Sequence, residues 1–129
     1  MRENLYHGKR KDNGEWVEGY YVPVGEYHYI LTGKLELVSY LGFEHFLVIP
    51  ETVGQYIELP DKNGKKIFEG DIVRDAETSE VGKIFFDKYT STFVICFENT
   101  IADFNASYSL EVIGNIYDNP ELIGGEANE

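Results

Sequence analysis

Two segments of the chain repeat one local pattern, and this pattern constrains the fold more than any other feature of the sequence. Asn13-Gly14 precedes residues 16–22 (Trp-Val-Glu-Gly-Tyr-Tyr-Val), and Asn63-Gly64 precedes residues 67–73 (Ile-Phe-Glu-Gly-Asp-Ile-Val). Asn-Gly favours a tight turn because both residues tolerate positive φ. The Glu-Gly pair that follows favours a bulge or a close approach of another segment. The pattern therefore predicts a small β unit that occurs twice.

The composition favours one small β-rich protein. The chain has 129 residues, which is enough for one compact domain or for two miniature halves. Its ten Tyr, eight Phe and one Trp supply large side chains for a core, and aromatic residues fit pleated, half-buried surfaces. We therefore expect an independently folded, mainly β protein.

Turn residues separate about nine short candidate strands along the chain. Pro23 is expected to end the first strand, and residues 118–122 to form a short C-terminal helical turn. Regularly spaced short strands predict small barrels or a sandwich. The possible β sub-units are residues 1–56 and 57–123, within a single domain 1–129, and residues 124–129 are expected to fray. The candidate strands span residues 16–22, 27–31, 34–40, 46–49, 51–56, 67–73, 81–87, 92–98 and 110–117.

The charge disfavours a nucleic-acid binder. The chain contains eleven Lys and Arg and 23 Asp and Glu, which gives a formal net charge of −12. Non-specific binding to nucleic acid depends on cations that neutralise phosphates. Cations cluster only at residues 9–11 and among Lys62, Lys65 and Lys66, beside the two Asn-Gly turns, where solvated turns explain them. The excess of acid suits solubility and a basic partner surface.

The single cysteine and the N-terminus indicate the compartment. Cys96 allows no intramolecular disulfide, which favours a reducing environment. It lies in the apolar run 93–97, where burial makes it a poor nucleophile. Residues 1–4 do not begin an apolar signal segment, and no stretch approaches the length of a membrane span. We expect a cytoplasmic protein without membrane contact.

No residue pattern specifies a catalytic, cofactor or metal site. A calcium loop that starts at Asp61 would need Gly and Glu where Lys66 and Ile72 stand. A looser metal site shared by Glu69 and Asp71 stays open. The histidines lack the spacing of zinc sites, and the glycines form no phosphate loop. The residues considered and set aside are His7, His28, His45, Gly8, Gly14 and Gly124-Gly125.

Four tyrosines form the most conspicuous aromatic group. Tyr20, Tyr21, Tyr27 and Tyr29 lie on two neighbouring candidate strands. On exposed strands they could stack single-stranded bases. Core filling and cross-strand packing explain them more simply, because few cations are present to track a nucleic-acid backbone. Exposed tyrosines are equally common in protein interfaces.

Two longer motifs carry a family resemblance. Residues 48–73 read Val-Ile-Pro-Glu-Thr-Val-Gly-Gln-Tyr, then Leu59 and Asp-Lys-Asn-Gly-Lys-Lys-Ile-Phe-Glu-Gly-Asp-Ile-Val; residues 110–122 read Leu-Glu-Val-Ile-Gly-Asn-Ile-Tyr-Asp-Asn-Pro-Glu-Leu. In this order they resemble the YopX family of phage and prophage proteins. The resemblance implies paired SH3-like barrels from an internal repeat and no established activity. The resemblance assigns no catalytic residue to this chain. It implies that the motif positions Gly54, Gly70 and Gly114 serve the fold and not a reaction.

These observations lead to a hypothesis about function. We expect a phage- or prophage-derived, non-enzymatic interaction or assembly module in the cytoplasm of a bacterial host. Its partners would be a host or phage protein and further copies of itself, since repeated units and open strand edges favour self-association. The alternative is a regulator that binds or mimics nucleic acid. An enzyme is the third possibility, and it would need a cleft with a carboxylate of raised pKa.

Overall fold

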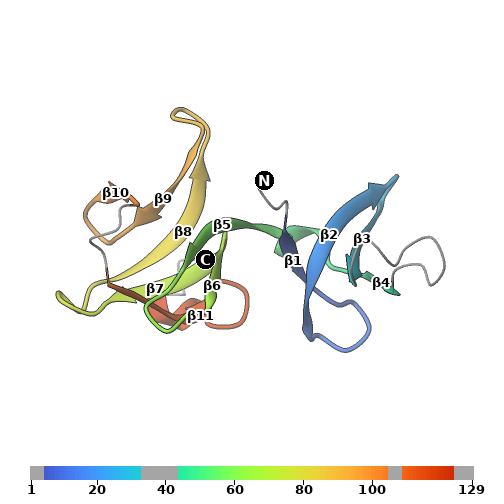
Figure 1. Cartoon of the computed structure of the whole chain (residues 1–129), viewed down its shortest axis with the longest axis horizontal. Helices are drawn as coiled ribbons and strands as arrows, with labels where there is room; N and C mark the ends of the chain where they lie inside the picture. Colours follow the sequence, from blue (N-terminus) through green and yellow to red (C-terminus); the bar gives the residue numbers. More distant parts are fainter. Residues whose placement is uncertain (1–4, 33–43, 105–108, 124–129) are drawn as a thin grey trace. The chain divides into compact units, whose positions relative to one another are not determined.

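The computed structural model describes residues 5–32, 44–104 and 109–123 (Figure 1). These residues form eleven β-strands and two short 3-10 helices, which confirms a mainly β fold. The chain divides into two compact units, unit 1 from Met1 to Tyr56 and unit 2 from Ile57 to Glu129. The candidate strand at residues 34–40 and the tail 124–129 lie outside the described residues.

Unit 1 is an antiparallel sheet. The strands are β1 (Tyr6–Lys9), β2 (Trp16–Val24), β3 (Tyr27–Thr32), β4 (Glu44–Leu47) and the first residues of β5 (Gly54–Pro60), with the 3-10 helix η2 (Pro50–Thr52) before β5. They are hydrogen-bonded in the order β4-β3-β2-β1-β5. Strand β1 was not predicted, because its sequence Tyr-His-Gly-Lys is short and lacks apolar alternation.

The first Asn-Gly turn forms as predicted. Gly14 has a φ of +76°, and the Asn13 side chain accepts a hydrogen bond of 2.9 Å from the amide of Glu15. The amide of Arg10 donates to the Glu15 carbonyl at 2.8 Å. This turn joins β1 to β2 and sets the register in which Lys9 faces Trp16.

The prediction that Pro23 ends the strand is wrong. Pro23 pairs with His28, and β2 continues to Val24. Proline is tolerated because β1 pairs with β2 only as far as Gly19, which leaves one edge of β2 open beyond that residue among the described strands.

Unit 2 contains a five-stranded antiparallel sheet. Its strands are β7 (Asp71–Asp75), β8 (Val81–Asp87), β9 (Thr92–Cys96), β10 (Ile101–Asp103) and β11 (Leu110–Asn115), in the order β10-β9-β8-β7-β11. Unit 2 also contains the later residues of β5 and the whole of β6 (Lys66–Phe68). The 3-10 helix η3 (Pro120–Ile123) is the predicted C-terminal helical turn. Strands β8 and β9 form the predicted hairpin, coloured yellow to orange in Figure 1. Strand β10 was not predicted.

The segment 67–73 is two strands, where one was predicted. Gly70, with a φ of +95°, makes a tight turn between β6 and β7. The buried Asp71 side chain closes this turn by accepting a hydrogen bond of 2.8 Å from the amide of Phe68. In the first copy of the pattern Gly19 lies inside β2 instead, where an added Cβ would stand 2.0 Å from the carbonyl oxygen of Leu31. The two Glu-Gly pairs therefore have different conformations.

A buried aspartate fastens the second Asn-Gly turn to the sheet. The Asp61 carboxylate accepts hydrogen bonds from the amides of Asn63 (2.8 Å), Lys65 (2.9 Å) and Val112 (2.9 Å). Burial alone would raise the pKa of Asp61, but these three bonds and the charge of Lys65 outweigh it and hold the pKa below its ordinary value. The Asp61 backbone amide also donates to the Lys65 carbonyl at 2.7 Å. The turn therefore protects the outer edge of β11.

One face of the five-stranded sheet carries the core of unit 2. The register places Ile84, Ile95 and Val73 on that face, where they pack with further apolar side chains. The strand ladders leave β10 and β11 as edges of this sheet and β4 as the last strand in unit 1, so they do not close a barrel in the described residues. At the end of β4, the Leu47 carbonyl accepts a hydrogen bond of 3.0 Å from the amide of Lys11, and Val48 forms an isolated bridge with Arg10. The expectation of two repeated SH3-like barrels stays a prediction. The buried cluster is Ile67, Val73, Ile84, Ile95, Phe97 and Leu110.

Candidate binding pocket

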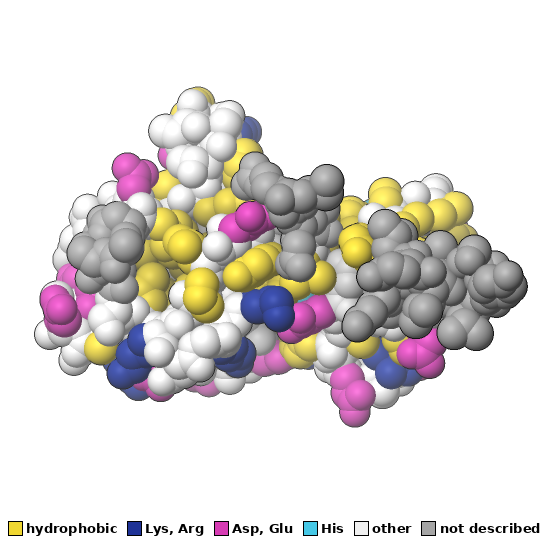
Figure 2. All heavy atoms as spheres, in the orientation of Figure 1, with side chains coloured by type: hydrophobic (Ala, Val, Ile, Leu, Met, Phe, Trp, Pro, Cys, Tyr) yellow, Lys and Arg dark blue, Asp and Glu magenta, His cyan; other side chains and the backbone are white. Residues whose placement is uncertain are grey.

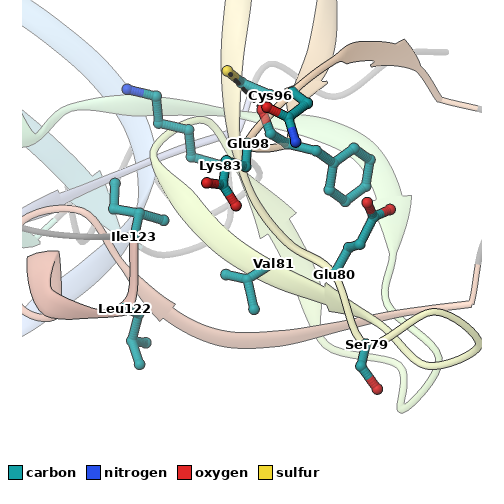
Figure 3. A pocket seen from close by; sticks show the side chains of 10 residues that line it. Ser79, Glu80, Val81, Lys83, Cys96, Glu98, Leu122 and Ile123 are labelled. Atoms are coloured by element: carbon teal, nitrogen blue, oxygen red, sulfur yellow. Dashed lines mark hydrogen bonds between the residues drawn. The ribbon is translucent and has the colours of Figure 1, made fainter.

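An open pocket of about 640 Å³ lies on unit 2 (Figure 3). Its volume falls within the range of small-ligand sites, roughly 300–1,000 Å³. The wall is built from the start of β8, the end of β9, the turn after β9, and η3, which packs against β8. The lining residues are Ser79, Glu80, Val81, Lys83, Cys96, Phe97, Glu98, Asn99, Leu122 and Ile123.

The apolar part of the pocket follows from strand alternation. Val81 and Lys83 alternate along β8 with the buried Gly82 and Ile84, so their side chains lie on the face opposite the core. Leu122 and Ile123 come from η3 at the other side of the pocket, and Leu122 is 38% exposed. Phe97, which is buried, reaches both the core and the pocket. An apolar surface thus stays open to solvent between two elements.

Charged groups surround this apolar surface. Glu80 and Glu98 are exposed and Lys83 is half-buried. In the view of Figure 3 the Lys83 ammonium lies at one end of the pocket, the Glu80 carboxylate at the other, and the Glu98 carboxylate between them. In the part of the chain that the structure describes, no ion pair joins Lys83 to a carboxylate. The pocket therefore offers two carboxylates and one ammonium group for binding.

Cys96 lies in the pocket and is more exposed than its sequence suggested. The expectation of a buried thiol is wrong, because Cys96 is half-buried at the end of β9, on the face opposite the core residue Ile95, where it lines the pocket. It pairs across the ladder with Lys83, and its thiol lies 3.7 Å from the Phe97 carbonyl oxygen. The sequence drew attention to Cys96 as the single cysteine, but no sequence pattern indicated the pocket that it lines.

The histidines are kept apart and each serves the packing of unit 1. His7 is buried against the ring of Trp16 at 4.5 Å between centroids. The ring nitrogen Nδ1 of His28 is hydrogen-bonded to the Tyr21 hydroxyl at 2.6 Å. His45 lies edge-on to Tyr29 at 5.8 Å. No group of three potential metal ligands gathers among the described residues.

The acidic residues considered for calcium have structural contacts. Asp61 and Asp71 are both buried and accept backbone hydrogen bonds at the two ends of β6. Glu69 is half-buried in the turn before Asp71. These hydrogen bonds hold the strands in place. The hydrogen bond from the Val112 amide to Asp61 could not be predicted from the spacing of residues in the sequence.

The four tyrosines do not form one platform. The register of β2 with β3 places Tyr20, Tyr27 and Tyr29 on one face and Tyr21 on the other. Tyr20 and Tyr27 are 38% and 49% exposed, and no Lys or Arg stands on this part of β2, β3 or β4. A face that stacks nucleic-acid bases needs cations along the backbone, so this geometry does not favour nucleic acid.

The basic cluster at residues 9–11 is also partly used by the fold. Arg10 forms a bidentate pair with Asp12 at 2.7 and 2.9 Å, and its guanidinium lies 4.3 Å from the centre of the Phe46 ring. Lys62, Lys65 and Lys66 are exposed in and beside the second Asn-Gly turn.

The model of the YopX protein family matches residues 6–124, nearly the whole chain. The chain belongs to the YopX protein family. Comparison with curated proteins gives no match. In this YopX-family chain the described residues contain no helix with the length and apolar character that a membrane span requires.

Proposed function

We propose that this YopX-family protein is a non-enzymatic interaction module that binds a protein partner through unit 2. The observation that carries the proposal is the open pocket between β8, the end of β9 and η3, in which apolar side chains stay accessible beside charged groups. Apolar surface that is open and rimmed by polar groups is typical of binding sites.

Exposed apolar side chains elsewhere on the surface also support a protein partner. Exposed apolar side chains occur in both units, among them Ile101, Leu122 and Phe86 in unit 2. The face drawn in Figure 2 shows such apolar side chains between scattered charged ones. Patches that mix apolar and polar side chains are typical of non-obligate protein interfaces. The family resemblance supports a phage or prophage setting, so the partner would be a host or phage protein met in the bacterial cytoplasm.

Two further properties belong to the same proposal. The edge strand β10 leaves backbone groups on one side without a strand partner in the described residues, and such an edge favours pairing with another copy. We therefore expect a homo-oligomer, which light scattering at several concentrations tests. The predicted SH3-like architecture of two repeated units would make each unit a separate binding surface.

Affinity capture tests the proposed function. Tagged protein is incubated with lysate of a bacterial host, with and without nuclease treatment, and captured proteins are identified by mass spectrometry. We expect a saturable protein partner that survives nuclease. Recovery only of nuclease-sensitive material would favour the alternative, a regulator that binds nucleic acid. Displacement of the captured partner by DNA would favour nucleic-acid mimicry, for which the net charge of −12 is the supporting observation.

A further inference from the structure

The geometry points to a basic partner segment: we propose that the pocket of unit 2 takes an arginine side chain flanked by apolar residues. This inference rests on the proposed function and names the chemistry of the partner. It starts from the two kinds of group that the pocket brings together, an apolar floor and carboxylates at its rim.

The apolar floor suits the stem of a long basic side chain. Val81 and Ile123 are half-buried and Leu122 is 38% exposed, so a partner can cover them. Arginine and lysine bury their methylene stems along apolar surface while the charged head stays near water or a counter-charge. Apolar neighbours of the arginine would cover the remaining part of the floor.

The rim supplies the counter-charge. Glu80 and Glu98 are exposed, and no ion pair with a described residue neutralises either carboxylate. The Glu80 carboxylate accepts a hydrogen bond from the Thr78 hydroxyl, and this bond is weak because the two oxygens are 3.4 Å apart. Arginine is favoured over lysine because its planar guanidinium can bind a carboxylate through two parallel hydrogen bonds. The net charge of −12 attracts the same kind of partner over a longer range.

Lys83 places a positive charge in the same pocket, and this charge provides a second test of the proposal. Its ammonium shares the pocket with the carboxylates and lies at the end away from Glu80 in Figure 3. An arginine ligand is repelled by Lys83 and attracted by Glu98, whereas an acidic ligand would show the reverse. Neutralising Lys83 and neutralising the glutamates should therefore shift affinity in opposite directions.

Cys96 provides a reporter inside the pocket without any added label. It is the single cysteine of the chain and it lines the pocket, so a bound ligand should slow its alkylation by iodoacetamide. The probe is the peptide acetyl-Ala-Leu-Arg-Leu-Ala-amide, with the glutamate analogue of the same peptide and free arginine amide as comparisons. The extent of reaction is read from intact mass, and each variant is normalised to its own rate without peptide.

The expected result has three parts. The arginine peptide protects Cys96, and the half-protecting concentration rises about fivefold in the E80Q/E98Q variant, because two exposed charge pairs are lost. It is unchanged in E51Q/E77Q, which removes the same charge from exposed positions outside the pocket. It falls about twofold in K83Q. Thermal denaturation of each variant checks that the fold is kept.

Several results would overturn the proposal. Protection by the glutamate peptide at equal concentration would show an acidic ligand. Equal protection by arginine amide would show a small cation site and no peptide segment. Absence of protection at millimolar peptide, or equal protection in E80Q/E98Q, would also contradict it. Failure of this inference can be told apart from failure of the proposed function. If E80Q/E98Q still binds a captured partner, the pocket is not the binding site but the interaction role stands. If the peptide protects Cys96 but no partner is captured, the interaction role is rejected.

Discussion

The two units of the chain stabilise their strands in different ways. Of the eleven buried apolar side chains among the described residues, nine lie in unit 2 and only Ile30 and Val48 lie in unit 1. Unit 1 instead has aromatic pairs, such as the half-buried Tyr6 and Tyr21 at 5.3 Å and the buried His7 against the half-buried Trp16 at 4.5 Å. An aliphatic core packs densely and gives a rigid frame. The difference suggests that unit 2 is the frame on which a binding pocket can be held.

The contrast is sharpest at the two Asn-Gly turns, whose sequences are similar. In unit 1 the Asp12 carboxylate is exposed and binds the guanidinium of Arg10. In unit 2 the Asp61 carboxylate is 7% exposed and binds three backbone amides, one of them 51 residues away. Similar turns therefore have an exposed ion pair beside them in one unit and a buried carboxylate in the other.

The largest effect is expected from Asp61→Ala. The substitution leaves the amide of Val112 without its acceptor and removes two further bonds in the turn, which should lower the free energy of unfolding by about 3 kcal/mol. Urea denaturation followed by circular dichroism measures the change. Asp12→Ala is the matched control and should leave the transition unmoved, since its ion pair is exposed. Equal effects of the two substitutions would break the comparison between the turns.

An effect of similar size is expected at one of the two Glu-Gly pairs. Gly19→Ala should cost about 3 kcal/mol because the new Cβ meets the Leu31 backbone. Gly70→Ala should cost about 2 kcal/mol because φ is +95° there. Gly25→Ala, where φ is positive but the space is open, is the control and should cost about 1 kcal/mol. A loss at Gly19 no larger than the loss at Gly25 would contradict the close approach of the Leu31 backbone.

Acid should weaken unit 2 through Asp61. Its pKa in the folded protein is lower than the ordinary value, so the carboxylate stabilises the fold above the ordinary pKa, and this contribution is lost as the pH falls through the lowered pKa. Amide hydrogen exchange at Val112 across the acid range measures the loss. Asp61→Asn should remove the pH dependence at that amide, and an unchanged acid response in this variant would assign the effect to another group.

The smallest effect is expected in unit 1. Tyr21→Phe removes the hydrogen bond between the Tyr21 hydroxyl and His28, and should lower the free energy of unfolding by about 1 kcal/mol. Tyr27→Phe, at a position 49% exposed, is the control and should have no measurable effect. Thermal denaturation compares the two, and a large loss at Tyr27 would show that its exposed hydroxyl also stabilises the fold.

Local features of the fold could be predicted from the sequence, and long-range ones could not. The Asn-Gly turns and the hairpin of β8 and β9 follow from neighbouring residues, so they were predicted. The separation of Tyr21 from the other tyrosines and the short strand β10 depend on register and on pairing partners. The split at Gly70 was missed because the same Glu-Gly pattern lies inside a strand at Gly19 and forms a turn at Gly70. The pocket was not predicted, because it requires η3 to lie against β8, some forty residues earlier in the chain.

The central claim is that unit 2 holds the binding pocket and that this pocket takes a basic, apolar segment. Titration of ¹⁵N-labelled protein with the arginine peptide, followed by amide chemical shifts over the whole chain, tests it most directly. The account predicts shifts at Glu80, Lys83, Glu98 and Leu122, reduced in E80Q/E98Q, with unit 1 unchanged. Shifts that centre on Tyr20 and Tyr27 in unit 1, or an equal response to the glutamate peptide, would contradict it.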